Sequence, residues 1–224
     1  MTKLCSNKAI LHTGEYDIEN NAWGTTNPLP PQCVFGPPDA DIGWQWDWSG
    51  NDASRIMGYP EIIFGKKPFN QASTTTQLPR PINDLDQLHS DFSYQIDANG
   101  AWNVAFDLWL TNSASADEKS IAVEVMIWVL GNGLTPAGNR IATVKTPNGS
   151  SQFYGGKMQY WNYFAFVLDR QMHFGSIDLN AYLKYLVNEN LISTNLCLAS
   201  VEFGTEIAFG GGDFSLAEYE VKIG

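Results

Sequence analysis

The clearest structural signal in the chain lies at residues 121–130, which read IAVEVMIWVL. Successive side chains of a β-strand point to opposite faces, so the valines and isoleucine at every second position predict one buried face. The positions between them carry Glu124, Met126 and Trp128, which places a carboxylate beside a tryptophan on the other face. The run therefore predicts a strand with one face in the core and a second face on which apolar neighbours solvate the Glu124 carboxylate poorly.

Two further runs repeat this arrangement. Residues 103–110 (NVAFDLWL) place Asp107 and a tryptophan on the face opposite the apolar residues, and residues 200–208 (SVEFGTEIA) place Glu202 and Glu206 on either side of a glycine. Short runs rich in β-branched and aromatic residues, separated by Gly, Pro, Asn and Ser, continue along most of the chain. These are too many strands for one open sheet, so we predict an all-β sandwich or barrel. If the three acid-bearing strands are neighbours, they form the floor of a cleft.

One segment departs from the β-pattern. Apolar residues recur at helical spacing from Ile177 to Val187, after a candidate N-cap at Ser176 and before asparagines at 188 and 190. This predicts a single amphipathic helix of about three turns, packed on the outer face of one sheet. No repeat or linker interrupts the chain, so we expect one domain over residues 1–224.

Composition narrows the function. The 224 residues include 13% aromatic but only 17% charged residues, and the formal net charge is −11. A chain of that sign repels phosphate backbones, which argues against nucleic-acid binding. No apolar run reaches the length of a membrane span, and residues 1–10 lack the apolar stretch of a secretion leader. The aromatic excess instead favours a surface on which hydroxyl-rich rings stack.

The chain has three cysteines and three histidines. Cys5 and Cys33, 28 positions apart in a Pro- and Asn-rich region, are expected to form a disulfide worth about 3.5 kcal/mol. Such a bridge implies an extracellular protein. Cys197 lies in an apolar run and is expected to be buried and free. The histidines belong to no ligand string, which argues against a zinc site, and we expect no metal or other cofactor.

The acidic residues decide between two classes of function. A single acid on the polar face of a strand is usually only solvated, but acids beside tryptophan have a raised pKa and are commoner at functional sites. Two carboxyls across a groove lined with aromatic rings are the arrangement that cleaves glycosidic bonds. A carbohydrate-binding module would use the same groove without turnover, and the acid pair is what favours the enzyme.

These residues and motifs resemble glycoside hydrolase family 12, the endo-β-1,4-glucanases and xyloglucanases, over nearly the whole chain. The resemblance implies a β-jelly-roll sandwich of two curved antiparallel sheets with one α-helix on the convex face. It also includes an early cysteine pair like Cys5 and Cys33. The motifs that carry it, in chain order, are NNAWG (20–24), WQWDWSG (44–50), GYPEIIFG (58–65), FDLWL (106–110), VEVMIW (123–128) and FGTE (203–206).

The resemblance assigns catalytic roles by matching residues. Glu124 in VEVMIW matches the family's nucleophile, and Glu206 in FGTE matches its general acid/base. Asp107 in FDLWL matches the acid that hydrogen-bonds the nucleophile. Glu202, two residues away on the same face, is the rival for the acid, and it loses because the FGTE motif ends at Glu206.

The resemblance also implies substrate contacts. Trp23 matches a stacking platform for a sugar ring, Asn21 a hydroxyl partner, and Met126 the residue beside the nucleophile under the sugar. The further candidates for substrate contact that the resemblance implies are Tyr59, Trp128, Asn162 and Trp48. For Trp48 and Trp128, filling of the sheet is the alternative, and for Tyr59 a place at a strand edge.

The implied activity is retaining hydrolysis of internal β-1,4-glucosidic bonds in cellulose or mixed-linkage glucan. Xyloglucan-specific cleavage is the alternative within the family. Retention requires the two carboxyl groups about 5–5.5 Å apart, against roughly 6.5–9.5 Å for inversion. We expect a secreted monomer whose partner is a β-glucan polysaccharide.

Overall fold

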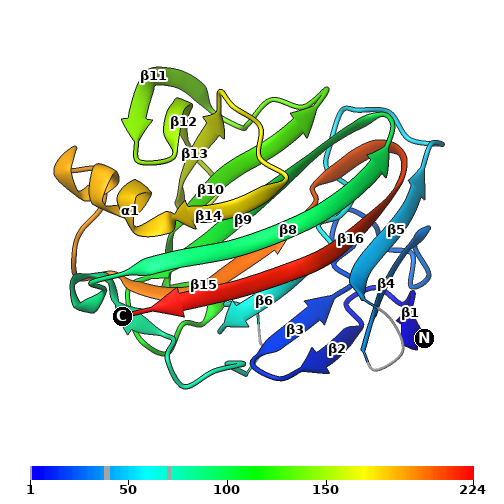
Figure 1. The fold of residues 1–224 in the computed structure, drawn as a ribbon, viewed down its shortest axis with the longest axis horizontal. Coiled ribbons are helices and arrows are strands. Elements are labelled where there is room, and N and C mark those ends of the chain that lie inside the picture. Colours follow the sequence, from blue (N-terminus) through cyan, green and yellow to red (C-terminus); the bar gives the residue numbers. More distant parts are fainter. Residues whose placement is uncertain (1, 38–40, 70–71) are drawn as a thin grey trace.

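The computed structural model describes residues 2–37, 41–69 and 72–224, which form two β-sheets and one α-helix (Figure 1). The sheets lie against each other as two layers, and we call them the outer sheet and the cleft sheet. The prediction of an all-β sandwich with one helix is confirmed. Within these residues, no helix is long and apolar enough to cross a membrane.

The outer sheet has six strands, all paired antiparallel. In spatial order they are β1 (Thr2–Leu4), β4 (Gln32–Gly36), β5 (Ile42–Trp48), β16 (Ile207–Ile223), β8 (Leu88–Ala98) and β14 (Phe174–Asp178). The first residues of β16 also pair with the cleft sheet, at Ile207 and Phe209, so this long strand links the two layers.

The cleft sheet is the larger layer. In spatial order its strands are β2 (Ile10–Thr13), β3 (Tyr16–Glu19), β6 (Glu61–Gly65), β15 (Cys197–Gly204), β9 (Ala101–Thr111), β10 (Ile121–Asn132), β13 (Asn162–Leu168), β12 (Gly149–Lys157) and β11 (Asn139–Thr146). The short β7 (Arg80–Pro81) pairs with one end of β15, and two 3-10 turns span Ile82–Asp84 and Glu118–Ser120. Among the described strands, β10 and β13 form the one parallel pair, which differs from the antiparallel pairing that we predicted.

The core lies between the two sheets, where alternation predicts it. Phe106 of β9 and Phe203 of β15 point from the cleft sheet into the core and are fully buried. Phe92 of the outer sheet contacts both rings, with centroids 5.5 and 5.4 Å away. Burial of one such ring contributes roughly 1.5–3 kcal/mol, so the core face holds the strands of the cleft sheet in register.

The helix α1 (Leu179–Asn188) covers the core face of β12 and β13, beyond the edge of the outer sheet, and not the outer face of a sheet as we predicted (Figure 1). Tyr182 packs on Phe166 with ring centroids 5.0 Å apart. The helix begins two residues later than predicted, because residues 174–178 pair with β8 as β14. Its N-cap is therefore Asp178, whose carboxylate accepts a hydrogen bond from the backbone N–H of Ala181, and not Ser176.

The cysteines lie as predicted. Cys5 and Cys33 form a disulfide that ties the segment after β1 to β4. Cys197 is buried at the start of β15 and is free.

Candidate active site

The cleft sheet carries a cleft of about 620 Å³ on the face turned away from the core. Its floor is made of alternate residues of β9, β10 and β15, as the sequence predicts. All predicted catalytic and substrate-contact residues line it except Trp48 and Asn162, and those that do are Asn21, Trp23, Tyr59, Asp107, Glu124, Met126, Trp128 and Glu206.

Strand pairing brings the carboxyls of the floor together. Glu124 of β10 pairs with Trp109 of β9, and on the next rung of this face Met126 pairs with Asp107. On the other side of β9, Glu202 of β15 pairs with Asp107. The Cβ atoms of residues directly opposite each other lie about 4.5–5.5 Å apart. Three acids from three neighbouring strands are therefore within electrostatic reach of one another.

Glu124 is held by a neutral donor. The indole N–H of Trp161 donates a hydrogen bond of 2.7 Å to its Oε2. Burial raises the pKa of Glu124 to about 8; the Trp161 hydrogen bond lowers it, and the charge of Glu206 raises it further. The effect of Glu206 on this pKa indicates that the two predicted catalytic carboxyls are near each other.

Glu206 follows β15 and is fixed by Asn103 of β9. The side-chain amide of Asn103 donates to Glu206 Oε2, and its Oδ1 accepts from the Glu206 backbone N–H at 3.1 Å. Burial raises the pKa of Glu206 to about 7, and the bond from Asn103 opposes this rise. A carboxyl with this pKa holds a proton at weakly acidic pH, as a general acid must.

Asp107 is more enclosed than Glu124 and Glu206. Its exposed fraction is 5%, and its Oδ1 has no hydrogen-bond partner among the described residues. Burial raises its pKa well above the ordinary value, and the charges of Glu124 and Glu202 raise it further. The surroundings of Asp107 therefore favour its protonated form.

Aromatic side chains line the cleft around the acids. Trp109 packs edge-on against both Phe69 and Trp161, with ring centroids 5.2 and 5.5 Å away. Trp23 exposes 56% of its surface, which fits the predicted role of a stacking platform. The phenol of Tyr163 donates to the sulfur of Met126 at 3.3 Å and so fixes this part of the cleft floor.

Three of the predicted substrate-contact residues are not free to bind a sugar as we predicted. Trp48 does not line the cleft; it is buried, and its indole N–H donates to Gln32. Tyr59 lines the cleft, but its hydroxyl is used in a 2.9 Å bond to the carbonyl of Ala105. Asn162 is a second predicted site residue that the structure does not bring to the cleft, because it pairs with Val123, whose side chain is in the core.

Residues near Asn162 take the place that we predicted for it. Trp161 and Tyr163 both line the cleft, and neither was predicted. Tyr163 could have been found by alternation, since it pairs with Glu124 on the parallel strand β13. Trp161 lies in the turn before β13, where no periodicity indicates its direction.

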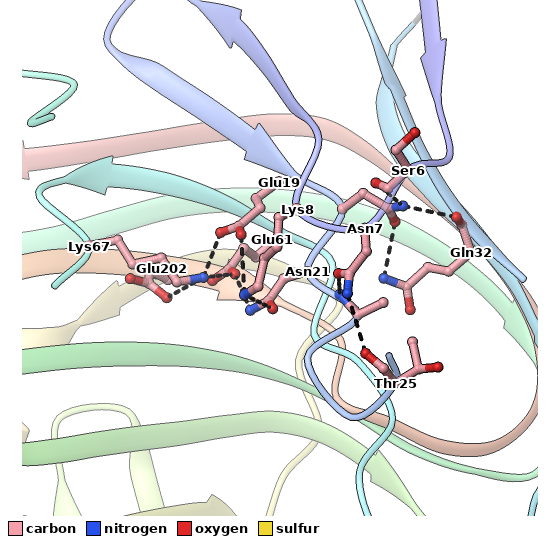
Figure 2. Close-up of polar contacts among 12 residues, drawn as sticks. Ser6, Asn7, Lys8, Glu19, Asn21, Thr25, Gln32, Glu61, Lys67 and Glu202 are labelled. Atoms are coloured by element: carbon pink, nitrogen blue, oxygen red, sulfur yellow. Dashed lines mark hydrogen bonds and ion pairs between the residues drawn. The ribbon is translucent and has the colours of Figure 1, made fainter. Parts of the chain in front are cut away.

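Gly204 is needed for the shape of this floor. A Cβ atom there would lie 2.5 Å from the carbonyl oxygen of Pro60 and 2.9 Å from the ring of Tyr59. The absence of a side chain lets β15 approach these residues closely between Glu202 and Glu206. Glu202 itself is 1% exposed and accepts a 2.8 Å bond from Ser200, next to a buried lysine (Figure 2).

No group of three or more His, Cys, Asp or Glu side chains within residues 2–37, 41–69 and 72–224 is arranged to hold a metal ion.

Comparison with known proteins gives the same result over almost the whole chain. The family model for glycosyl hydrolase family 12 matches residues 14–224. Endoglucanase S of Pectobacterium parmentieri is 28% identical over 97% of this chain and 85% of its own length. Xyloglucan-specific endo-beta-1,4-glucanase A of Aspergillus aculeatus is 27% identical over 98% of this chain and 90% of its own length.

Solved structures show the same fold. The family 12 xyloglucanase from Bacillus licheniformis superposes with a TM-score of 0.92 at 27% identity, and both chains are fully covered. Endoglucanase cel12A from Rhodothermus marinus superposes with a TM-score of 0.88 at 24% identity. The two-layer sandwich is thus the curved jelly-roll that we predicted, and the chain belongs to glycosyl hydrolase family 12.

Proposed function

We propose that the protein is a retaining endo-β-1,4-glucanase in which Glu124 is the nucleophile and Glu206 is the general acid/base. The observation that carries this proposal is the shared environment of the two carboxyls. Both line one cleft, both have a raised pKa through burial, and both are held by neutral N–H donors. Because the family consists of hydrolases, the binding-module alternative is not pursued further.

In the first step, the ionised Glu124 attacks the anomeric carbon of the sugar above the cleft floor. Glu206 gives its proton to the glycosidic oxygen as the bond to the leaving chain breaks. In the second step, Glu206 takes a proton from water, and the oxygen of that water displaces Glu124 from the anomeric carbon. The carboxyl separation of about 5–5.5 Å that this route requires stays a prediction.

The roles need Glu124 to ionise before Glu206, although burial raises the pKa of Glu124 to about 8 and that of Glu206 to about 7. The two carboxyls depend on each other. Part of the rise at Glu124 comes from the charge of Glu206, so a proton on Glu206 favours the ionised form of Glu124. The pKa of Asp107 is raised well above normal, and a protonated Asp107 adds no charge to the site. The active form then carries two protons on three carboxyls: one on Asp107, one on Glu206 and none on Glu124.

The substrate is proposed to be unbranched β-1,4-glucan or mixed-linkage glucan. Xyloglucan is the second candidate, favoured by the names of relatives such as the Aspergillus aculeatus enzyme and the Bacillus licheniformis structure. The disulfide between Cys5 and Cys33 supports a site of action outside the cell. We still expect a monomer.

Release of reducing ends tests this proposal. The protein is incubated with carboxymethylcellulose, mixed-linkage β-glucan and xyloglucan, with Glu124→Gln as the matched inactive control. We expect release from at least one glucan by the wild-type protein and none by the variant. Binding of all three without release would contradict the proposed activity.

A further inference from the structure

A second group of carboxyls shares the cleft floor, and it surrounds a buried lysine. Lys67 follows β6, and its side chain is 3% exposed (Figure 2). Its Nζ lies 2.7 Å from Glu19 Oε2, contacts Glu61 Oε1, and lies 3.8 Å from Glu202 Oε2. The three glutamate side chains are at most 2% exposed. We call these four residues the lysine cluster.

Glu61 and Lys8 also affect the charge of the lysine cluster. Burial raises the pKa of Glu61 well above its ordinary value, and the charge of Glu202 raises it further against the opposing effect of Lys67. Lys8 adds a second cation 3.3 Å from Glu19 Oε1, but its side chain is 47% exposed. Lys67 is thus the cation that faces Glu202.

Glu202 connects this cluster to the catalytic acids. It pairs with Asp107 across β15 and β9, and both side chains line the cleft. Asp107 pairs in turn with Met126, two residues from Glu124. The charge of Glu202 raises the pKa of both Asp107 and Glu124. Four ionisable side chains therefore follow one another across the cleft floor, in the order Lys67, Glu202, Asp107 and Glu124.

We propose that Lys67 is a positioning residue for hydrolysis, because its ammonium group compensates Glu202 and so allows Glu124 to carry its negative charge two neighbours away. The inference rests on the proposed roles of Glu124 and Asp107. Lys67 acts through Glu202 and needs no contact with the sugar.

The sign of the effect follows from the charges. Without Lys67, the charge of Glu202 is uncompensated, so the ionised form of Glu124 is disfavoured and its pKa rises. Without the charge of Glu202, the pKa of Glu124 falls. Other ionisable groups belong to the lysine cluster, line the same cleft or interact electrostatically with Glu202. The acids are Glu19 of β3, Glu61 of β6, Asp107 of β9, Glu124 of β10 and Glu206 after β15. The cations are Lys8 and Arg55 in the cleft, and the phenols are those of Tyr59 and Tyr219, which are buried.

These two phenols are neutral under assay conditions, because burial raises the pKa of each well above 10. Lys67 and Glu202 can therefore be tested as a pair of opposite charges.

The test is the dependence of kcat/KM on pH, measured with a soluble glucan that the wild-type protein hydrolyses. The variants are Lys67→Met, Glu202→Gln and the double variant. We expect the acidic limb of Lys67→Met to move to higher pH by about one unit, and that of Glu202→Gln to move to lower pH. In the double variant, which lacks both charges, the limb returns close to its wild-type position.

Lys222→Met is the matched control. It removes the same charge from an exposed ion pair, where Lys222 Nζ lies 2.5 Å from Asp91 on the outer sheet. The acidic limb of this variant is expected to coincide with that of the wild-type protein. Circular dichroism and thermal unfolding verify that each variant is folded.

A folded Lys67→Met variant whose acidic limb coincides with that of wild type would overturn the inference. A purely structural role would lower stability, and activity at every pH, without moving the limb. If Lys67→Met does not fold, the Glu202→Gln variant tests the inference in its place. An acidic limb of kcat/KM that does not move to lower pH in that variant overturns the inference. Failure of the proposed function has a different signature, namely glucan hydrolysis by Glu124→Gln at the wild-type rate.

Discussion

Two groups of enclosed carboxyls lie on the same sheet and differ in the presence of a cation. Glu124, Asp107 and Glu206, the three proposed catalytic acids, form the group that we call the catalytic trio. An indole holds Glu124 and an amide holds Glu206. Among the described residues, no lysine or arginine forms an ion pair with them. The lysine cluster places three glutamates around a buried ammonium group.

The difference explains which acids can react. A neutral N–H donor stabilises an ionised carboxyl while leaving its pKa high, so a proton can still come and go near neutral pH. The ammonium group of Lys67 lies 2.7 Å from Glu19 Oε2 and holds that carboxylate in an ion pair. The comparison therefore predicts that the catalytic trio controls turnover and that the lysine cluster controls stability and pH dependence.

The largest expected effect is on turnover by the catalytic trio. Glu124→Gln removes the nucleophile and should lower kcat by about 10⁴-fold or more. Glu206→Gln should lower it by about 10²–10⁴-fold, and Asp107→Asn much less than Glu124→Gln, because Asp107 acts through its neighbour. Initial rates on the preferred glucan measure all three. Equal losses in Asp107→Asn and Glu124→Gln would show that the roles are misassigned.

The second effect is on the stability of the lysine cluster. Lys67→Met leaves ionised glutamates buried without their cation, which should lower the free energy of unfolding by about 3–5 kcal/mol. Lys222→Met should leave it unchanged, because that ion pair is exposed. Urea unfolding at pH 7 compares the two. If both variants are equally stable, the lysine cluster does not hold this part of the sheet together.

The third effect is the dependence of stability on pH in the catalytic trio. The pKa of Glu206 is raised from 4.5 to about 7 in the folded protein. This raised pKa stabilises the fold fully below pH 4.5, and the contribution is lost as pH rises through about 7, on the order of 3 kcal/mol in all. Glu206→Gln should remove that loss, so the variant gains on the wild-type protein between pH 5 and pH 8. Urea unfolding at both pH values would show parallel curves if the idea were wrong.

The smallest effect concerns the indole that holds the nucleophile. Trp161→Phe keeps a ring against Trp109 but removes the N–H that donates to Glu124. A hydrogen bond to a charged group contributes about 1.5–3 kcal/mol, so kcat should fall roughly 10- to 100-fold. The acidic limb of kcat/KM should move to higher pH, because the bond favours the ionised form. An unmoved limb would indicate that Trp161 contributes only packing.

Two members of the catalytic trio could be predicted from periodicity because they lie on regular strands. Period-2 alternation separates Glu124 and Asp107 from the core residues between them, and the cleft contains both. Glu206 follows β15, and the match to the FGTE motif indicated it. Gly204 could likewise be placed, since it stands between Glu202 and Glu206. Asn162 was carried from the family resemblance, and the alternation of β13 instead puts the next residue, Tyr163, in the cleft.

The lysine cluster could not be predicted in this way. Its members come from β3, β6, β15 and the segment after β6, and their meeting depends on the order of strands in the sheet. Lys67 follows a second lysine in the sequence, and nothing local indicates that Lys67 is buried while Lys66 reaches the carbonyl of Ser115 in an exposed contact. Trp161 was not predicted for a different reason. It lies in a turn, where no periodicity indicates the direction of its side chain.

The most direct test of the account is to trap the intermediate on the enzyme. An activated 2-deoxy-2-fluoro-β-cellobioside slows both steps, but its good leaving group allows the first to proceed, so the glycosyl-enzyme accumulates. Mass spectrometry of the digested protein should find one 2-deoxy-2-fluorocellobiosyl group on the peptide that contains Glu124, and none in Glu124→Gln. A label on Glu206 or Glu202, or rapid release of the α-anomer from an ordinary glucan, would contradict the assignment of Glu124 as the nucleophile of a retaining enzyme.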